Sequence, residues 1–94
     1  MEQLLTIPKE DIQDVYFSKE DVLHTPADLA ERRHKLHRAM LLGNVYRSKV
    51  NISFRNNYND LCKIETTVWA VFKNHVSVKS GKTIPIRAIE NIEF

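Results

Sequence analysis

Two histidines, His34 and His37, stand three positions apart, a spacing that would let both imidazoles reach one metal ion from a helix. A metal held by a protein needs three or four ligands, and the side chains left to complete the set are His24, Cys62 and His75. No pair of them has a recognised zinc-binding spacing. We therefore expect solvated histidines on a polar helix face, with no metal site and no cofactor.

Cys62, the one cysteine of the chain, could act as a nucleophile with a histidine as its base. A reactive cysteine needs an electropositive, partly open environment such as a helix N-terminus. Cys62 instead alternates in phase with Ile64 and Val68, and unpaired cysteines are among the most buried residues. We expect a small core residue. A single cysteine also excludes an intramolecular disulfide and indicates a reducing, cytoplasmic compartment.

Other catalytic patterns are weak. The chain has two glycines, Gly43 and Gly81, which a helix stop and a turn explain, so it contains no glycine-rich phosphate loop. Glu65 and the pair Glu90 and Glu93 are carboxylates without a matched partner in the predicted elements. We therefore expect a protein that is not an enzyme.

Basic side chains gather in and after one predicted helix, and they are the strongest functional candidates: Arg32, Arg33, Lys35, Arg38, Arg47 and Lys49. Clustered cations bind phosphate groups without regard to sequence. Small β-barrels bind single strands through such surfaces when aromatic platforms accompany them, and Trp69 and Tyr58 could be those platforms. This set predicts an anionic partner, either RNA or another single-stranded nucleic acid.

A protein-interaction module is the competing class and our first expectation. Four side chains of the predicted strands and turns would form its contact patch: Tyr58, Thr67, Trp69 and Val71. A thin apolar helix seam, an acidic N-terminal arm and a sheet edge near Pro85 suit docking to another chain or self-association. We expect a regulatory or adaptor module with a protein partner, nucleic acid being the alternative. No membrane is expected, because no apolar run approaches the ~20 residues that span a bilayer.

The elements that must position these residues fit one domain of 94 residues. Residues 1–24 carry six acidic side chains and two lysines, whereas residues 25–94 carry twelve basic and six acidic side chains. Two interpretations follow: the basic body meets an anionic partner, or the acidic arm folds back on the body and neutralises it. We predict an arm at 1–24, which could be flexible, and a helix with a small β-barrel at 25–94.

The segment after the arm predicts a helix of about 17 residues that ends at Leu42. Thr25 can cap its N-terminus, Pro26 suits its first turn, and Gly43 supplies a stop. Four side chains share its apolar face: Leu29, Leu36, Ala39 and Met40.

Beyond the helix the apolar period changes from 3.6 to two, which is typical of strands. Residues 50–55 alternate apolar and polar side chains, and residues 56–60 have the chemistry of a turn. Residues 61–73 predict a strand of about 40 Å, so long that we expect it to bend and to serve two sheets. Residues 76–79 predict a further strand, and residues 83–94 predict a short strand, one helical turn and a closing strand.

This order of elements resembles the Sm-like or Src-homology-type (SH3-like) small β-barrel, on the pattern Gly81, Ile84-Pro85-Ile86, Ile89 and Ile92. More narrowly, it is similar to the small bacterial inhibitors of the terminator protein Rho, and to uncharacterised bacterial families with the same ending. The resemblance covers residues 25–94. It implies an α+β fold in which an N-terminal helix precedes a five-stranded antiparallel barrel. The matching positions are core and turn positions, so the resemblance implies no functional residue.

Overall fold

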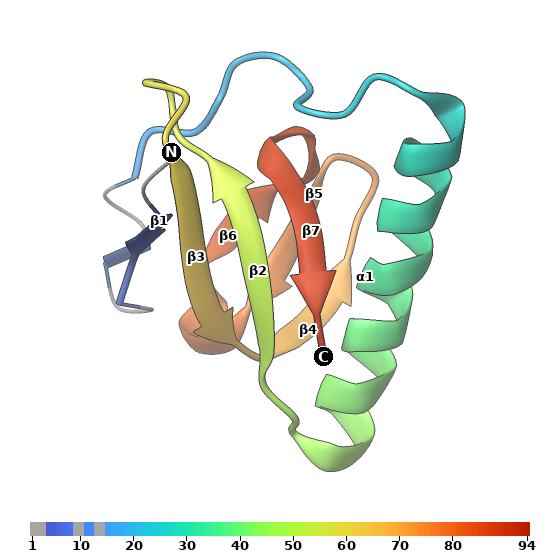
Figure 1. Cartoon of the computed structure of the whole chain (residues 1–94). Helices are drawn as coiled ribbons and strands as arrows, with labels where there is room; N and C mark the ends of the chain where they lie inside the picture. Colours follow the sequence, from blue (N-terminus) through green and yellow to red (C-terminus); the bar gives the residue numbers. More distant parts are fainter. Residues whose placement is uncertain (1–3, 9–10, 13–14) are drawn as a thin grey trace.

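The strands of the chain form two separate sheets. The computed structural model describes residues 4–8, 11–12 and 15–94, and within them the sheets have the orders β1-β3-β2-β7 and β4-β5-β6. The strands are β1 (Leu4–Thr6), β2 (Val50–Arg55), β3 (Leu61–Thr66), β4 (Val68–Val71), β5 (His75–Val78), β6 (Thr83–Pro85) and β7 (Ile89–Glu93). Neighbouring strands run antiparallel except for the parallel pair β1 and β3. One long helix, α1 (Pro26–Tyr46), stands beside both sheets (Figure 1).

Helix α1 begins where the sequence predicts but ends later. The Thr25 hydroxyl caps it by accepting a hydrogen bond from the backbone N–H of Asp28 at 3.1 Å. The predicted stop at Gly43 is wrong, because α1 continues through this residue to Tyr46. Arg47 then closes the helix in the left-handed conformation, with φ of 55°, and its N–H donates to the Gly43 carbonyl.

Gly43 allows a close approach between backbones. A Cβ at this position would overlap the carbonyl oxygen of Val68 and would lie 3.0 Å from Cγ2 of Thr67. The helix backbone can therefore lie directly against β4 only because this residue is glycine.

The predicted apolar face of α1 is partly wrong, because Leu29 is 36 % exposed. The buried residues of the helix are Arg32, Leu36, Ala39 and Gly43.

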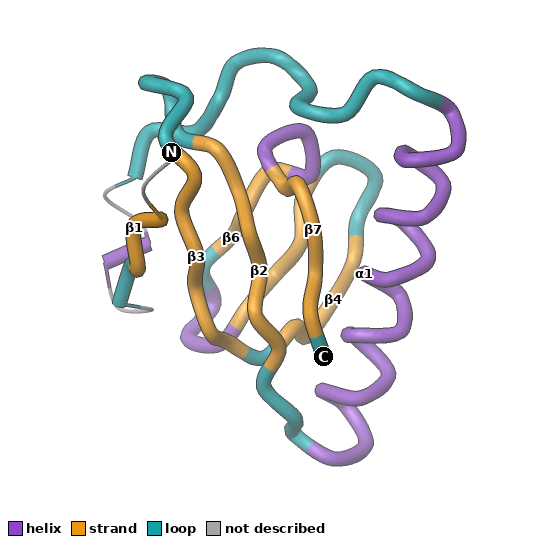
Figure 2. Tube along the Cα trace, in the orientation of Figure 1, coloured by secondary structure: helices purple, strands orange, loops and turns teal. Residues whose placement is uncertain are grey.

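The core lies between the two sheets, and two other segments cover its sides. Its largest members include Phe54 from β2, Ile64 from β3, Ile84 from β6 and Ile92 from β7. Helix α1 packs against the edge strands β4 and β7. The N-terminal segment lies on the opposite side of the molecule (Figures 1 and 2), where Ile12 is 1 % exposed and belongs to the core.

The predicted fold, an N-terminal helix followed by a five-stranded Sm-like or SH3-like barrel, is wrong. Strand β1 precedes α1, and the seven strands of the described residues make two open sheets. Residues 61–73 do bend and serve both sheets, as predicted, because Thr67 separates β3 from β4. The sheets do not close into a barrel because α1 fills the space between the edges β4 and β7. The α+β class is confirmed.

The described part of the acidic arm lies on the body of the protein. Strand β1 pairs with β3, and Phe17 forms a bridge with Asn56. The Phe17 ring also lies 5.3 Å from the ring of Phe54, measured between centroids. Four charged residues of the arm lie outside the described residues: Glu2, Lys9, Glu10 and Asp14.

Replacing Gly43 with alanine should destabilise the protein, although alanine favours a helix over glycine by about 1 kcal/mol. The new methyl group would have to displace the backbone of β4, and overpacking of this kind costs about 1–3 kcal/mol. We expect Gly43→Ala to lower the urea midpoint of unfolding. His37→Ala, on the exposed face of the same helix, is the control and should leave the midpoint unchanged or raise it. A midpoint for Gly43→Ala at or above that of the parent would contradict the backbone contact.

Candidate anion-binding groove

Arg32, the first residue of the predicted basic set, is buried and holds three segments together. Its side chain is 6 % exposed and binds the Asp21 carboxylate through both terminal nitrogens, each at 2.9 Å. One of these nitrogens also donates to the Ile89 carbonyl at 3.0 Å. Arg32 therefore joins the N-terminal arm, α1 and β7 through charge-assisted hydrogen bonds, and it offers nothing to a partner in solution.

The same contact sets the acidity of Asp21. Hydrogen bonds from Arg32 hold the pKa of this carboxyl below its ordinary value of 3.8, although partial burial acts in the opposite direction. The ion pair is therefore intact at neutral pH.

Arg33, Lys35 and Arg38 also contact the body. Arg33 donates to the carbonyls of Phe72 and Lys73, each at 2.9 Å, just beyond the end of β4. Lys35 bonds the Asn91 side chain at 2.9 Å and lies 3.3 Å from the Glu31 carboxylate. The Arg38 guanidinium lies 4.5 Å from the centroid of the Phe94 ring. The basic helix is thus in large part a set of structural contacts.

The two remaining predicted cations, Arg47 and Lys49, lie in one groove with Trp69. The groove has a volume of about 460 Å³, and we call it the Trp69 groove. Its walls are formed by Asn44, Arg47, Lys49, Thr67, Trp69 and Lys79. The structure therefore brings together residues that the sequence assigned to separate hypotheses, phosphate binding and protein docking.

Four segments converge to build the Trp69 groove. The left-handed turn at Arg47 ends α1, and Lys49 directly precedes β2. Thr67 links β3 to β4, and its carbonyl accepts a hydrogen bond from the Lys79 backbone N–H at 3.0 Å. This bond holds the end of the β4–β5 hairpin beside the helix end.

Strand β4 directs Trp69 away from the core and into the lining of the groove. The pairing of β4 with β5 shifts between Val68 and Ala70, so the alternation of side chains is interrupted at Trp69. Val68 is buried and Val71 packs against the core, while Trp69 remains half-buried. Alternation from the buried Val68 already places Trp69 on the outer face, and the bulge instead returns Val71 to the core.

The predicted contact patch is therefore dispersed. Thr67 is 3 % exposed and contributes only to the wall of the groove. Tyr58 is 79 % exposed, but it belongs to the turn after β2, whereas Lys49 directly precedes β2. About 20 Å, the length of a six-residue strand, separates Tyr58 from the groove.

The Trp69 groove is positive and its cations are available. None of the six described residues that line it is acidic. Within the described part of the chain, the side chains of Arg47, Lys49 and Lys79 make no hydrogen bond or ion pair. Three cations around a half-buried indole suit a ligand that combines negative groups with a flat apolar surface.

Lys79 and Asn44 were not among the site residues predicted from the sequence. Lys79 follows from the hairpin register, because Val68 pairs with Val78 and the residue directly after β5 then faces Thr67. The predicted end of the helix at Leu42 placed Asn44 outside it, and Asn44 lines the groove because α1 continues past Gly43 to Tyr46.

The candidates for metal binding and catalysis are scattered. His34 and His37 are exposed on α1, whereas His75 stacks on Phe72 with centroids 4.7 Å apart. Cys62 is fully buried, and burial raises the pKa of its thiol. Glu90 binds Arg55 at 2.6 Å. The described residues include no group of three His, Cys, Asp or Glu side chains that could hold a metal ion.

No family model, no curated protein and no solved structure matches this chain. Similarity to known proteins therefore assigns no function, and a functional proposal has to come from the chemistry of the Trp69 groove. Among the described residues, no helix has both the length and the apolar content that a membrane crossing requires.

Acid should lower the free energy of unfolding by protonating Asp21. Because the folded-state pKa of Asp21 lies below the unfolded value, the stabilisation is complete above about pH 4 and is lost as the pH falls through the folded pKa. Asp21→Asn should lower the free energy of unfolding at pH 7 by about 1–3 kcal/mol, since it leaves the buried Arg32 charge without its partner. It should also make the free energy of unfolding depend less on pH between about pH 5 and pH 2, where a carboxyl with a lowered pKa titrates.

Urea titrations across this pH range measure both effects. Glu20→Gln removes the exposed neighbouring carboxylate and is the matched control, which should leave the profile close to that of the parent. Equal acid profiles for Asp21→Asn and the parent would contradict a role for the Asp21–Arg32 pair in stability.

Proposed function

We propose that this protein is a small non-enzymatic binding module that holds an anionic partner in the Trp69 groove. One observation carries the proposal: Arg47, Lys49 and Lys79 surround Trp69 without an acidic neighbour in the lining and without internal partners in the described residues. Complementary charge steers a partner to such a surface, and the indole adds contact area.

Two kinds of partner match this chemistry. A single-stranded nucleic acid offers phosphates and bases, whereas an acidic protein segment offers carboxylates and apolar side chains. The sequence predicts both, with the protein first. A cytoplasmic location, suggested by the single reduced Cys62, belongs to the same proposal.

The binding energy would come from two sources. Contacts between cations and phosphate or carboxylate groups at an exposed site are individually modest, and they weaken as salt screens them. Stacking on an aromatic ring contributes about 1–3 kcal/mol for each base and depends little on salt. Affinity in the Trp69 groove should therefore fall with salt without disappearing.

A second protein-docking surface is supported by two exposed tyrosines. Tyr16 and Tyr58 are 77 % and 79 % exposed, and the Tyr16 carbonyl accepts a hydrogen bond from the N–H of Asn57 at 2.8 Å. We call this pair the Tyr16–Tyr58 patch. Exposed tyrosines are frequent among the residues that dominate protein interfaces.

The first test of the Trp69 groove is a titration with two fluorescein-labelled anions, a 16-nucleotide oligouridine and an oligoglutamate peptide. Trp69 is the single tryptophan of the chain, so its fluorescence reports occupancy of the groove directly. We expect at least one probe to bind at low salt, to change Trp69 emission and to weaken at physiological salt.

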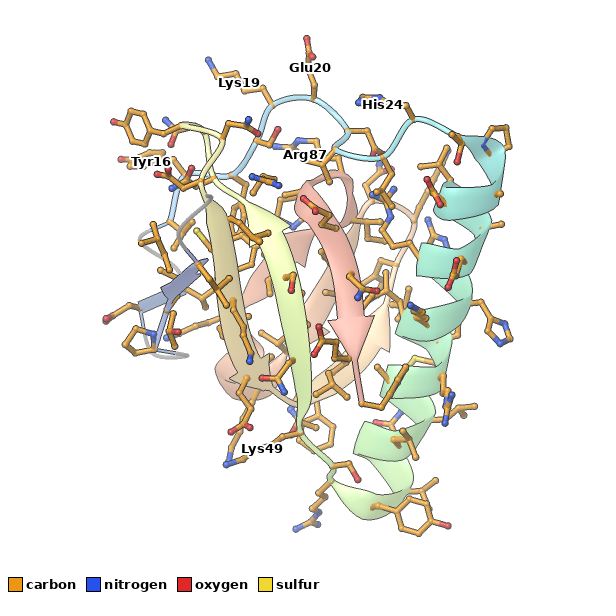
Figure 3. The ribbon with its side chains drawn as sticks, in the orientation of Figure 1. Tyr16, Lys19, Glu20, His24, Lys49 and Arg87 are labelled. Carbon is orange, nitrogen blue, oxygen red and sulfur yellow. The ribbon has the colours of Figure 1, made fainter. Side chains whose placement is uncertain are left out.

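Three variants locate the site by fluorescence anisotropy of the bound probe. Arg47→Asn removes a charge while asparagine tolerates the left-handed backbone, so the fold should survive. Arg47→Asn and Lys79→Ala should each weaken binding several-fold, and Trp69→Leu should weaken it about tenfold. Lys19→Ala is the charge-matched control, because Lys19 lies at the opposite end of the molecule from Lys49 (Figure 3). Failure of both probes to bind at low salt would overturn the proposal.

If the Tyr16–Tyr58 patch is a contact between copies of the chain, the protein should self-associate, and replacing both tyrosines should abolish the association. Sedimentation velocity at increasing protein concentration should show a dimer for the parent chain. The double variant Tyr16→Ser, Tyr58→Ser should stay monomeric, because two large interface side chains are lost. If the parent chain sediments as a monomer at every concentration, the Tyr16–Tyr58 patch is excluded as a contact between copies.

A further inference from the structure

A second positive cavity lies along the same helix. It has a volume of about 340 Å³ and is lined by Asp21, Arg32, Arg33, Lys73, Asn74, Ile86 and Arg87. Its one carboxylate, Asp21, is bound to Arg32. Arg33 and Arg87 donate to backbone carbonyls, which engages part of each guanidinium without cancelling its charge. We call this cavity the Arg87 pocket, and its net charge is positive.

The Arg87 pocket and the Trp69 groove lie at the two ends of the line where α1 meets β4. Arg33 binds the carbonyl of Phe72 beyond the end of β4, whereas Gly43 packs on Val68 at its beginning. Arg33 and Asn44 are eleven positions apart, which is about three turns or 16 Å, so they share one face of the helix. In Figure 3 Arg87 and Lys49 accordingly lie at opposite ends of the molecule.

The surface between the two cavities carries no acidic group from these two elements. His37 and Met40 are the residues of α1 that lie between Arg33 and Asn44 on this face. Strand β4 contains only Val68, Trp69, Ala70 and Val71. The carboxylates of α1 are on the other flank, where Asp28 and Glu31 line a cavity of about 280 Å³ that also contains Glu90.

An aromatic residue lines the groove at one end of this line, and another adjoins a lining cation in sequence at the other end. Trp69 lies in the groove at one end. At the other end Phe72 is 49 % exposed and stacks on His75, with ring centroids 4.7 Å apart and planes inclined by 25°. Phe72 is the immediate neighbour of Lys73, which lines the Arg87 pocket.

We infer that the Trp69 groove and the Arg87 pocket are two ends of one site that binds single-stranded nucleic acid along α1 and β4. The inference rests on the proposed function of the Trp69 groove. Phosphates would meet the cations at both ends, and unstacked bases would lie on Trp69 and on the Phe72–His75 pair. A duplex keeps its bases inside the stack and cannot use these rings, and an acidic peptide has no flat group at regular intervals to place on them.

The ring surfaces also set the selectivity. Aromatic faces accept every base, and a site made from stacking and phosphate contacts is tolerant of sequence. Binding should therefore depend on the length of the strand more than on its bases.

Length dependence and one variant test this site. Oligouridines of about 4, 8 and 16 nucleotides cover the range that small single-strand-binding domains occupy. We expect each to change Trp69 emission, with affinity rising by about tenfold or more from the shortest to the longest that the site accommodates. Lys73→Ala, which removes an exposed cation of the Arg87 pocket, should weaken the 16-mer several-fold and reduce its salt slope by about 0.7. Lys19→Ala should leave the affinity of every length unchanged.

The outcomes separate this inference from the function on which it rests. If no oligonucleotide and no oligoglutamate alters Trp69 emission at low salt, the proposed function fails and the extended site fails with it. If oligouridine binds equally at all lengths and Lys73→Ala changes nothing, the groove stands and the extended site is overturned. Tighter binding of oligoglutamate or of duplex than of the 16-mer would also overturn the single-strand assignment.

Discussion

Two adjacent arginines of α1 fasten the helix to both sheets, and the architecture depends on them. Arg32 donates to the carbonyl of Ile89 in β7, the edge strand of the first sheet. Arg33 donates to the carbonyls of Phe72 and Lys73, directly after β4, the edge strand of the second. Edge carbonyls that would otherwise need another strand are satisfied by side chains. The two edges therefore need not pair with one another, and the strands form open sheets with a helix between them.

Burying a guanidinium in this way is unfavourable unless its charge is compensated. Asp21 supplies two charge-assisted hydrogen bonds to Arg32 and comes from the N-terminal arm. The arm is thereby drawn across the end of the molecule, while its preceding residues pair with β3 and bury Ile12. The helix and the arm thus cover opposite sides of the same core, and one carboxylate links them. Because these charges act inside the fold, the basic character left for a partner lies where α1 ends and along its β4 flank.

The local elements of this fold were predictable, and the long-range ones were not. The Thr25 cap and the bend in residues 61–73 follow from side-chain chemistry and strand length within a short window. The parallel pairing of β1 with β3 joins residues far apart in sequence, and nothing in the three residues of β1 specifies it. The same limit applies to the site. Arg47, Lys49 and Trp69 were each recognisable, but only the tertiary contact between Gly43 and Val68 places them together.

The backbone at Arg47 argues that this groove is more than an incidental gap. A helix that ends in the left-handed conformation usually has glycine or asparagine at that position, and another residue there costs roughly 1 kcal/mol. Arg47 adopts this conformation, with φ of 55°, although its side chain makes no hydrogen bond or ion pair within the described residues that would stabilise it. The fold alone would favour glycine here. A cation at a strained helix end, next to a half-buried indole and two lysines, is the arrangement that the proposed binding of an anionic partner requires.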